Sequence, residues 1–226
     1  MRQLAYEISQ VTLNLVFPIY CQGCGKNLPY SSKIYLCQRC SEKLGLSSPH
    51  LRTLADENSF FKQAWHCYKY EGLIKELIRK FKYHNKLHLK NTLAALLYEF
   101  VKNYVQYKNT DIIIPVPMHI SDERERGFNQ SDILAKELSL RLGIEYTRKS
   151  IIKHRHTKKQ IDLKKTERLK NITHAFTLGD AIALKNRDII LIDDVFTTGS
   201  TTNECSKVLT EYGTRSVSVL TLAKGA

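Results

Sequence analysis

Two adjacent carboxylates, Asp193 and Asp194, come directly before a short turn that is rich in hydroxyl groups. The turn contains one glycine, Gly199, and the hydroxyl-bearing residues Thr197, Thr198, Ser200, Thr201 and Thr202. Hydroxyls can donate to phosphate oxygens without adding charge, and Gly199 allows the backbone to approach an anion closely. Carboxylates beside such a turn can bind sugar hydroxyls or share a Mg²⁺ with the ligand. The stretch predicts a monophosphate site, because it lacks the lysine and glycine spacing of a nucleotide P-loop.

A buried strand and a helix are expected to position this turn. Ile189 to Ile192 form an unbroken run of β-branched and leucine side chains, which is typical of a strand buried on both faces of a parallel sheet. After the turn, apolar residues recur at helical spacing until Gly213. Strand, polar turn and helix in this order direct a helix N-terminus at a bound anion. The alternative is an ordinary helix cap with surface acids, which would need only one Ser or Thr.

Four of the six cysteines form a second group with its own chemistry: Cys21, Cys24, Cys37 and Cys40. They make two Cys-x2-Cys pairs separated by twelve residues, which can set four thiolates tetrahedrally around one Zn²⁺. Paired disulfides are the alternative, but they require an oxidising compartment. A redox Cys-x-x-Cys pair fits less well, because two such motifs close together favour a metal. We therefore predict a closed, structural zinc site.

Two arginines, Arg124 and Arg126, lie between a predicted buried strand over 111–117 and a predicted helix over 131–142. A loop placed after one core strand can face the phosphate turn that follows another strand of the same sheet. The guanidinium fork suits pyrophosphate, so both arginines are candidate catalytic residues together with the carboxylate pair. The alternative is a neutral loop, in which the arginines pair with the acids of the same run: Asp122, Glu123 and Glu125.

The chain is strongly basic, with 35 Lys and Arg against 22 Asp and Glu and a net charge of +13. Such a balance favours phosphate-bearing partners, either small ligands or nucleic acid. Cations gather in two stretches, 75–90 and 153–170, which we interpret as surfaces for a polyanion; solvated helix faces are the alternative. The candidate DNA-binding residues are Lys80, Lys82, Arg155, Lys158, Lys159, Lys164, Lys165 and Arg168.

The chain of 226 residues is long enough for one sizeable core and a small appendage. We predict an N-terminal helix and zinc module over 1–50. A second domain is predicted over 60–226, in which strands separated by helices form a parallel sheet flanked by helices. Within it, the aromatic-rich stretch Phe60 to Tyr70 predicts a short hairpin, and the polar residues 47–59 predict a connector.

The N-terminal segment, Leu4 to Phe17, is too polar for the apolar centre of a signal peptide. Its apolar spacing predicts an amphipathic helix that packs on the zinc module, with peripheral membrane contact as the alternative. No uninterrupted apolar run approaches the roughly twenty residues of a membrane span. We therefore expect no stable membrane insertion.

Several motifs together resemble the ComF family, known from natural competence. Ile190 to Thr201 resembles the signature with which type I phosphoribosyltransferases bind phosphoribosyl pyrophosphate (PRPP). The segment 124–131, Arg-Glu-Arg-Gly-Phe-Asn-Gln-Ser, resembles a ComF motif, as do the paired cysteines near the N-terminus. Phe81-Lys82-Tyr83 and Pro115-Val116-Pro117 also fit the family, although Phe81 stands where the family has leucine.

The resemblance implies a type I phosphoribosyltransferase fold with a small N-terminal zinc module. It also implies that the acidic pair meets the ribose hydroxyls and Mg²⁺, that the turn holds the 5′-phosphate, and that Arg124 or Arg126 helps pyrophosphate leave. The implied PRPP-binding residues are Asp193, Asp194, Val195, Phe196, Thr197, Thr198, Gly199, Ser200 and Thr201.

For function, the resemblance implies a cytoplasmic factor in DNA uptake for natural transformation. It would handle incoming single-stranded DNA with a helicase-like partner, and a location peripheral to the inner face of the membrane is the alternative to a fully cytoplasmic one. Two other functions stay open: a phosphoribosyltransferase enzyme with an unidentified acceptor, and a regulatory protein that senses PRPP.

Overall fold

A computed structural model describes residues 16–44, 52–83, 86–157, 172–179 and 184–225. Most of the predicted N-terminal helix, Leu4 to Phe17, lies outside these residues. Five of the candidate DNA-binding residues also lie outside them: Lys158, Lys159, Lys164, Lys165 and Arg168. Within the described ranges, no helix is both long enough and apolar enough to span a bilayer.

Among the described residues, six strands form the main sheet, in the order β3-β4-β10-β9-β5-β6. Their bounds are Arg52–Leu54 (β3), Gln63–Lys69 (β4), Ser216–Lys224 (β10), Asp188–Phe196 (β9), Ile112–Pro115 (β5) and Glu145–Tyr146 (β6). Neighbouring strands are parallel except for β3 and β4, which are antiparallel. The predicted parallel sheet is therefore confirmed, with one antiparallel strand added at its edge.

Strand β9 carries the predicted carboxylates and lies inside the sheet, between β5 and β10. Its residues Ile189 to Ile192 are at most 3% exposed, which confirms a strand buried on both faces. The register pairs Pro115, the last residue of β5, with Ile192. Because the two strands are parallel, the segments that follow them leave the sheet at the same edge. The fold thus brings residues 116–131 to the acidic pair.

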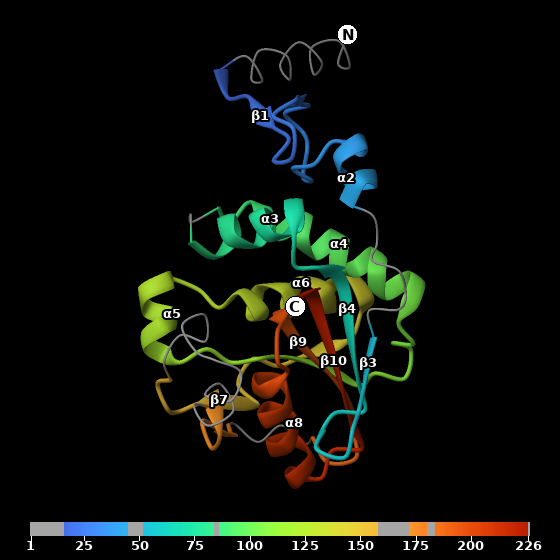
Figure 1. Cartoon of the computed structure of the whole chain (residues 1–226), viewed down its shortest axis with the longest axis vertical. Helices are drawn as coiled ribbons and strands as arrows, with labels where there is room; N and C mark the ends of the chain where they lie inside the picture. The colour runs from blue at the N-terminus through green and yellow to red at the C-terminus, as the bar shows by residue number, and fades with distance from the viewer. Residues whose placement is uncertain (1–15, 45–51, 84–85, 158–171, 180–183, 226) are drawn as a thin grey trace.

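Helices cover both faces of the sheet (Figure 1). Their bounds are Gly72–Tyr83 (α3), Leu89–Tyr104 (α4), Gln130–Leu142 (α6) and Ser200–Tyr212 (α8). Alternate side chains of β9 enter two separate cores, as expected for a strand whose successive residues face opposite sides. Ile190 packs with α3, α4 and α6, whereas Leu191 packs with Cys205 and Leu209 of α8. A small antiparallel hairpin, β7 (Ile151–Lys153) with β8 (Phe176–Leu178), contacts α8.

The four cysteines lie in a small module built from β1 (Ile19–Tyr20), β2 (Asn27–Leu28) and α2 (Gln38–Leu44). In Figure 1 this module sits above α3 and α4, on the side away from the sheet. Leu28 and Cys40 share a hydrophobic cluster with Ile74 and Leu77 of α3. The Tyr35 backbone N–H also donates to Thr92 Oγ1 of α4 at 2.9 Å. The module is thus packed onto helix α3, whose far end reaches the acidic pair.

The stretch Phe60 to Tyr70 forms one strand, and its antiparallel partner lies outside that stretch. The hairpin expected within Phe60 to Tyr70 is wrong, because that stretch contributes the single strand β4, which lies inside the sheet. Its antiparallel partner is β3, Arg52–Leu54, in the stretch predicted as a connector. β3 is a short strand at the edge of the sheet and pairs with β4 alone, a position where polar side chains are common. The Arg52 guanidinium of β3 lies 4.7 Å from the centre of the Trp65 ring of β4.

The loop expected around the two arginines is also wrong, because residues Ile120–Arg126 form helix α5. The His119 side chain accepts from the Ser121 N–H at its start, and Gly127, with φ of 85°, ends it in the left-handed conformation. Acids occupy its first turn and arginines its last, which is the favourable order for the helix dipole. A helix this short has too few residues to show a periodic apolar pattern in sequence.

Candidate functional site

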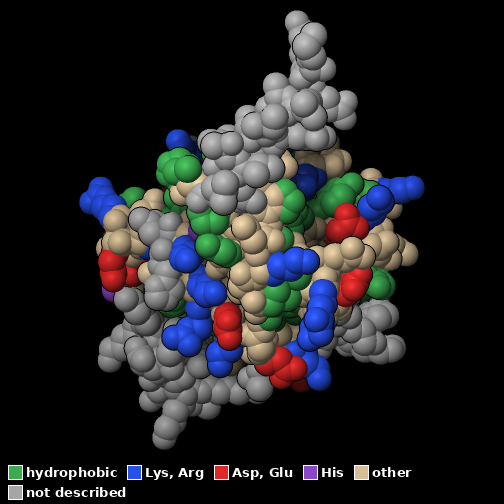
Figure 2. All heavy atoms as spheres, turned by 90° about the horizontal axis from the view of Figure 1, so that it is seen from above, with side chains coloured by type: hydrophobic (Ala, Val, Ile, Leu, Met, Phe, Trp, Pro, Cys, Tyr) green, Lys and Arg blue, Asp and Glu red, His purple; other side chains and the backbone are tan. Residues whose placement is uncertain are grey.

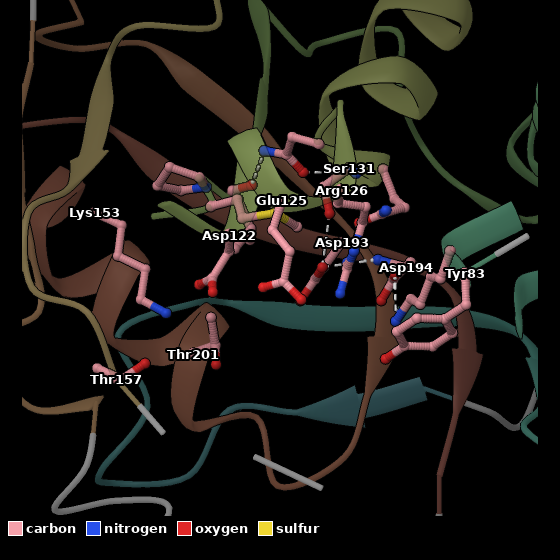
Figure 3. A pocket seen from close by; sticks show the side chains of 16 residues that line it. Tyr83, Asp122, Glu125, Arg126, Ser131, Lys153, Thr157, Asp193, Asp194 and Thr201 are labelled. Atoms are coloured by element: carbon pink, nitrogen blue, oxygen red, sulfur yellow. Dashed lines mark hydrogen bonds and ion pairs between the residues drawn. The ribbon is translucent and has the colours of Figure 1, made fainter. Parts of the chain in front are cut away.

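A cavity of about 570 Å³ opens where β5 and β9 end. Figure 3 shows its labelled side chains converging from several elements, with Asp193 and Asp194, in the carboxyl-terminal half of β9, on one side. Residues that follow β5, including Arg126 and Ser131, form another wall. Lys82 and Tyr83, at the end of α3, complete that side of the cavity. The fold therefore brings together three segments that the sequence analysis singled out separately.

Asp193 and Asp194 differ in their surroundings. Asp193 Oδ1 accepts from Ser131 Oγ at 2.8 Å and from the Asp194 N–H at 2.9 Å. Burial, together with the charge of Asp194, raises the pKa of Asp193 to about 7. Asp194 Oδ2 instead lies 2.6 Å from Lys82 Nζ. Burial alone would lower the pKa of Lys82, but the charge of Asp194, the hydrogen bond to it and the charge of Asp193 together outweigh burial and raise the pKa.

The hydroxyl turn lies next to the acidic pair and is shaped by Gly199. This residue has φ of 76°, and a Cβ at its position would lie 2.5 Å from Phe196 Cζ. Phe196 is 6% exposed and packs against the buried ring of His66, with centroids 4.6 Å apart. The Phe196 ring therefore packs directly against the turn at Gly199 and leaves no room for a side chain there. The other predicted ligand residues, from Val195 to Thr201 except Thr198, line a hollow of about 30 Å³ that also includes Asp193 and Thr202.

Thr198 supports the turn through its hydroxyl, which lies 2.7 Å from Ser200 Oγ. Gly199 occupies the cap position of α8 and has no side chain that could accept from the first N–H groups of the helix. A bound anion could take that role, because the positive end of the helix dipole faces the turn. The turn thus has the layout of an anion site.

The two candidate arginines are placed differently. Arg126 lines the cavity, donates through Nη1 to Gln130 Oε1 at 2.7 Å, and lies 5.1 Å from the centre of the Tyr83 ring. Arg124 is exposed and does not line the cavity. Two of the three acids of α5 face other partners: Glu123 pairs with Arg148, and Asp122 lies 3.0 Å from His156. The third, Glu125, lines the cavity. Of the two arginines, only Arg126 is placed to meet a ligand in this cavity.

Comparison with known proteins places the chain in a family, although no family model matches it. It is 35% identical to competence protein F of Haemophilus influenzae over 215 residues, which cover 90% of each chain. The chain belongs to the competence protein F (ComF) family. It is also 30% identical to the DNA utilization protein YhgH of Shigella flexneri, over 90% of this chain and 83% of that protein. A purine phosphoribosyltransferase from Pyrococcus horikoshii overlaps 60% of this chain and 73% of its own at 20% identity, with a TM-score of 0.39.

The four cysteine thiols of this ComF protein gather as a metal site requires. Their sulfur atoms all lie within 4.8 Å of one another, and Cys24 Sγ is 3.7 Å from Cys37 Sγ. Four thiolates at the usual metal–sulfur distance of about 2.3 Å in a tetrahedron would be about 3.8 Å apart, so the spacing fits. Gly23 is required here, because a Cβ at its position would lie 2.9 Å from Cys40 Sγ.

Backbone N–H groups favour the thiolate form of Cys21, which is the form that binds a metal. Burial by itself would raise the pKa of Cys21, but N–H groups outweigh it and lower the pKa to about 6. The foremost of these is the Cys37 N–H, which donates to Cys21 Sγ at 3.3 Å. Cys40, buried behind the others, has its pKa raised to about 12 by burial and by the neighbouring thiols. The two remaining cysteines, Cys67 and Cys205, are fully buried elsewhere.

The described candidate DNA-binding residues lie in three separate places. Lys82 points into the cavity and pairs with Asp194, so it is not part of an outer surface. Lys80 Nζ lies 3.5 Å from Gln22 O, at the contact with the cysteine module. Arg155 is exposed and donates to Thr173 O at 2.5 Å. The described residues therefore do not form one continuous basic strip.

Several residues that line the cavity were not assigned to the site by the sequence analysis, among them Gln130, Ser131, Lys153 and Thr157. Ser131 holds Asp193, and Gln130 is 1% exposed with an Nε2 that has no partner among the described residues. Lys153 and Thr157 enter the cavity from the hairpin side, and burial lowers the pKa of Lys153. Ser131 and Gln130 belong to the 124–131 motif and lie at the start of α6. Polar side chains at that position were the sequence feature that could have indicated a role in the site.

Proposed function

We propose that the cavity binds PRPP together with Mg²⁺, and that this ComF protein handles single-stranded DNA in DNA uptake. The observation that supports the first part most directly is the meeting of the acidic pair, the anion turn and the cations Lys82 and Arg126 at one cavity. Its volume, about 570 Å³, falls among small-molecule sites, which span roughly 300–1,000 Å³.

Each end of such a ligand has a complementary group in the cavity. The hydroxyl turn and the N-terminus of α8 would hold the 5′-phosphate. Asp193 and Asp194 would accept from the ribose hydroxyls, and Gln130 Nε2 offers a buried donor that has no partner among the described residues. Arg126 and Lys153 would face the diphosphate. Mg²⁺ bound with PRPP would neutralise part of the diphosphate charge.

Lys82 would regulate access of a cation to the acidic pair. Its ammonium already neutralises Asp194 at 2.6 Å, and a Mg²⁺ ion would compete for the same carboxylate. Released Lys82 could then turn to a ligand phosphate, since its side chain lines the same cavity. Loss of the ammonium would leave Asp194 as an uncompensated buried charge.

The two arginines provide a matched test of the diphosphate position. Arg126→Ala should weaken PRPP·Mg²⁺ binding about 10- to 100-fold, because it removes a charged hydrogen-bond donor from the cavity. Arg124→Ala, two residues away on the exposed side of α5, should change binding less than about twofold. Isothermal titration calorimetry with PRPP and with ribose 5-phosphate separates the two ends of the ligand. Equal effects of both substitutions, or an equal loss of ribose 5-phosphate binding by Arg126→Ala, would contradict this placement.

We also propose that the four thiolates bind a structural Zn²⁺. The support is the donor set, the spacing of the sulfurs and the N–H group that donates to Cys21 Sγ. Four thiolates fill a tetrahedral ion completely, so this metal would take no part in the chemistry of the cavity.

DNA handling is supported by the names of the relatives, one a competence protein and one a DNA utilization protein, and by the charge of +13. Figure 2 shows blue Lys and Arg side chains spread over one face, interspersed with red acids and green apolar patches. Binding would therefore be electrostatic and tolerant of sequence, and a helicase-like protein is the proposed partner.

Salt is the sharpest probe of this interaction. Binding of a fluorescent oligo(dT), followed by anisotropy, should weaken at least about tenfold between 50 and 200 mM salt, as expected when a few phosphates are neutralised. Lys164→Gln with Lys165→Gln should reduce the slope, whereas Lys102→Gln on α4 serves as the control. Salt-independent affinity, or no binding at low salt, would leave the enzyme function as the better account.

A phosphoribosyltransferase activity is the second candidate, because Asp193 titrates near neutral pH beside the proposed ribose site. A transferase would release pyrophosphate when an acceptor is supplied, and Asp194→Ala would abolish that release. A DNA-binding module would keep its DNA affinity after the same substitution.

A further inference from the structure

A second group of metal-ligating side chains lies beside the cavity, away from the cysteines: His119, Asp122 and His156. One ligand atom from each lies within 4.8 Å of the others, and His156 Nε2 is 3.0 Å from Asp122 Oδ1. The two imidazole rings meet edge to face with centroids 5.0 Å apart. We propose that these three residues bind a divalent transition-metal ion at the rim of the cavity.

Two separate segments of the chain bring the three ligands together. His119 caps α5 and Asp122 lies in its first turn, so a single short helix fixes their spacing. His156 follows strand β7, and the His154 N–H donates to Ala175 O at 3.1 Å, which holds this segment against the strand β8 side. The cluster therefore joins the wall formed by α5 to the wall that carries Lys153 and Thr157.

The donor set favours one class of ion. Two imidazoles and one carboxylate suit Zn²⁺, Co²⁺, Ni²⁺ or Mn²⁺, whereas Mg²⁺ and Ca²⁺ prefer oxygen ligands throughout. His119 Nδ1 lies 2.7 Å from Ser121 Oγ. When Nε2 binds the ion, Nδ1 would carry the proton and donate to this hydroxyl, in place of accepting from the Ser121 N–H, and such a bond orients the ring of a metal-binding histidine. Three protein ligands leave open coordination positions for water or for an oxygen of a bound phosphate.

The position of Asp122 connects this ion to the cavity. Figure 3 shows Asp122 pointing into the cavity, beside Glu125 and across from Lys153. An ion held there would add positive charge at the rim, and it would tie the two walls together. The alternative is an ion pair between His156 and Asp122 with no metal bound, so the experiment must detect the ion itself.

The test titrates Co²⁺ into tag-free, full-length protein that carries one zinc ion per chain, enough for the cysteine site alone, without PRPP. Calorimetry should detect one further equivalent, and its absorption should show weak d–d bands without the intense thiolate-to-cobalt band of a cysteine site. His156→Ala should weaken Co²⁺ binding more than about 100-fold, because it removes a direct ligand, whereas loss of a contact that only supports a ligand costs about 10- to 100-fold. His154→Ala, an exposed histidine two residues away, should leave it unchanged.

Two results would overturn the proposal: no further equivalent of Co²⁺ in the protein with one zinc per chain, or unchanged Co²⁺ affinity in His156→Ala. His156 is the chosen position because its side chain is 55% exposed, so its loss should not disturb folding. Asp122→Asn repeats the test on the second ligand. Because PRPP is absent, the outcome is independent of the proposed function.

Discussion

Asp193→Asn should abolish most PRPP·Mg²⁺ binding and at the same time stabilise the ligand-free protein above pH 7. The binding loss should be at least about 30-fold, as when a buried charged partner is removed from an interface. Asparagine keeps an oxygen for the Ser131 hydroxyl, so the local hydrogen bond can persist. The expected gain in stability arises because asparagine cannot ionise, whereas the buried Asp193 carboxyl loses its proton as the pH rises.

The sign of the stability change comes from proton binding in the two states. The pKa of Asp193 is about 7 in the folded protein and near 3.8 when unfolded, so the folded state binds the proton more tightly. Stability from this group is complete below pH 3.8 and is lost as pH rises to about 7. Asparagine cannot ionise and avoids this loss.

Thermal melts at pH 5 and pH 8 measure this difference. At pH 8 the variant should melt at least about 2 °C above the unsubstituted protein, the shift that roughly 1 kcal/mol produces in a chain of this size. The gap should shrink at pH 5. Glu211→Gln, on the exposed side of α8, is the control and should change neither property. A variant that melts lower at pH 8 would contradict the assigned environment of Asp193.

Cys40→Ser should release zinc and destabilise the protein by more than about 4 kcal/mol, as expected when a structural metal is lost. Cys40 is 7% exposed and lies where the cysteine module meets α3. Because α3 ends in Lys82 and Tyr83, the same substitution should also weaken PRPP·Mg²⁺ binding. Bound zinc by atomic absorption, urea unfolding and calorimetry measure the three effects.

Cys67→Ala is the matched control for this substitution. Cys67 is also a buried thiol, but it lies in β4, away from the metal group. Its loss should cost stability through packing alone and leave one zinc per chain. Full zinc content in Cys40→Ser would show that the thiols do not form one site.

The parts of the site that could be predicted from sequence are those encoded by contiguous residues. The acidic pair, the hydroxyl turn and the two cysteine pairs each carry their chemistry within a few positions, and local strand and helix patterns place them. The strand over Ile189–Ile192 and the helix ending at Gly213 were predictable for the same reason.

The parts that could not be predicted depend on distant contacts. The pairing of Lys82 with Asp194 joins α3 to β9, and no local pattern distinguishes Lys82 from the exposed lysines around it. Lys153 was similarly read as part of a basic surface, although burial beside the cavity gives it another role. The edge strand Arg52–Leu54 is held by its neighbour β4, which its own polar sequence does not reveal.

The most direct test of the central claim is calorimetric titration of PRPP into the zinc-loaded protein, with and without Mg²⁺, between pH 6 and pH 8. We expect one site that requires Mg²⁺, with affinity rising with pH as Asp193 loses its proton near pH 7. Asp194→Asn should remove this binding. Absence of binding at any pH, or binding that persists unchanged in Asp194→Asn, would contradict the assignment of the cavity to PRPP.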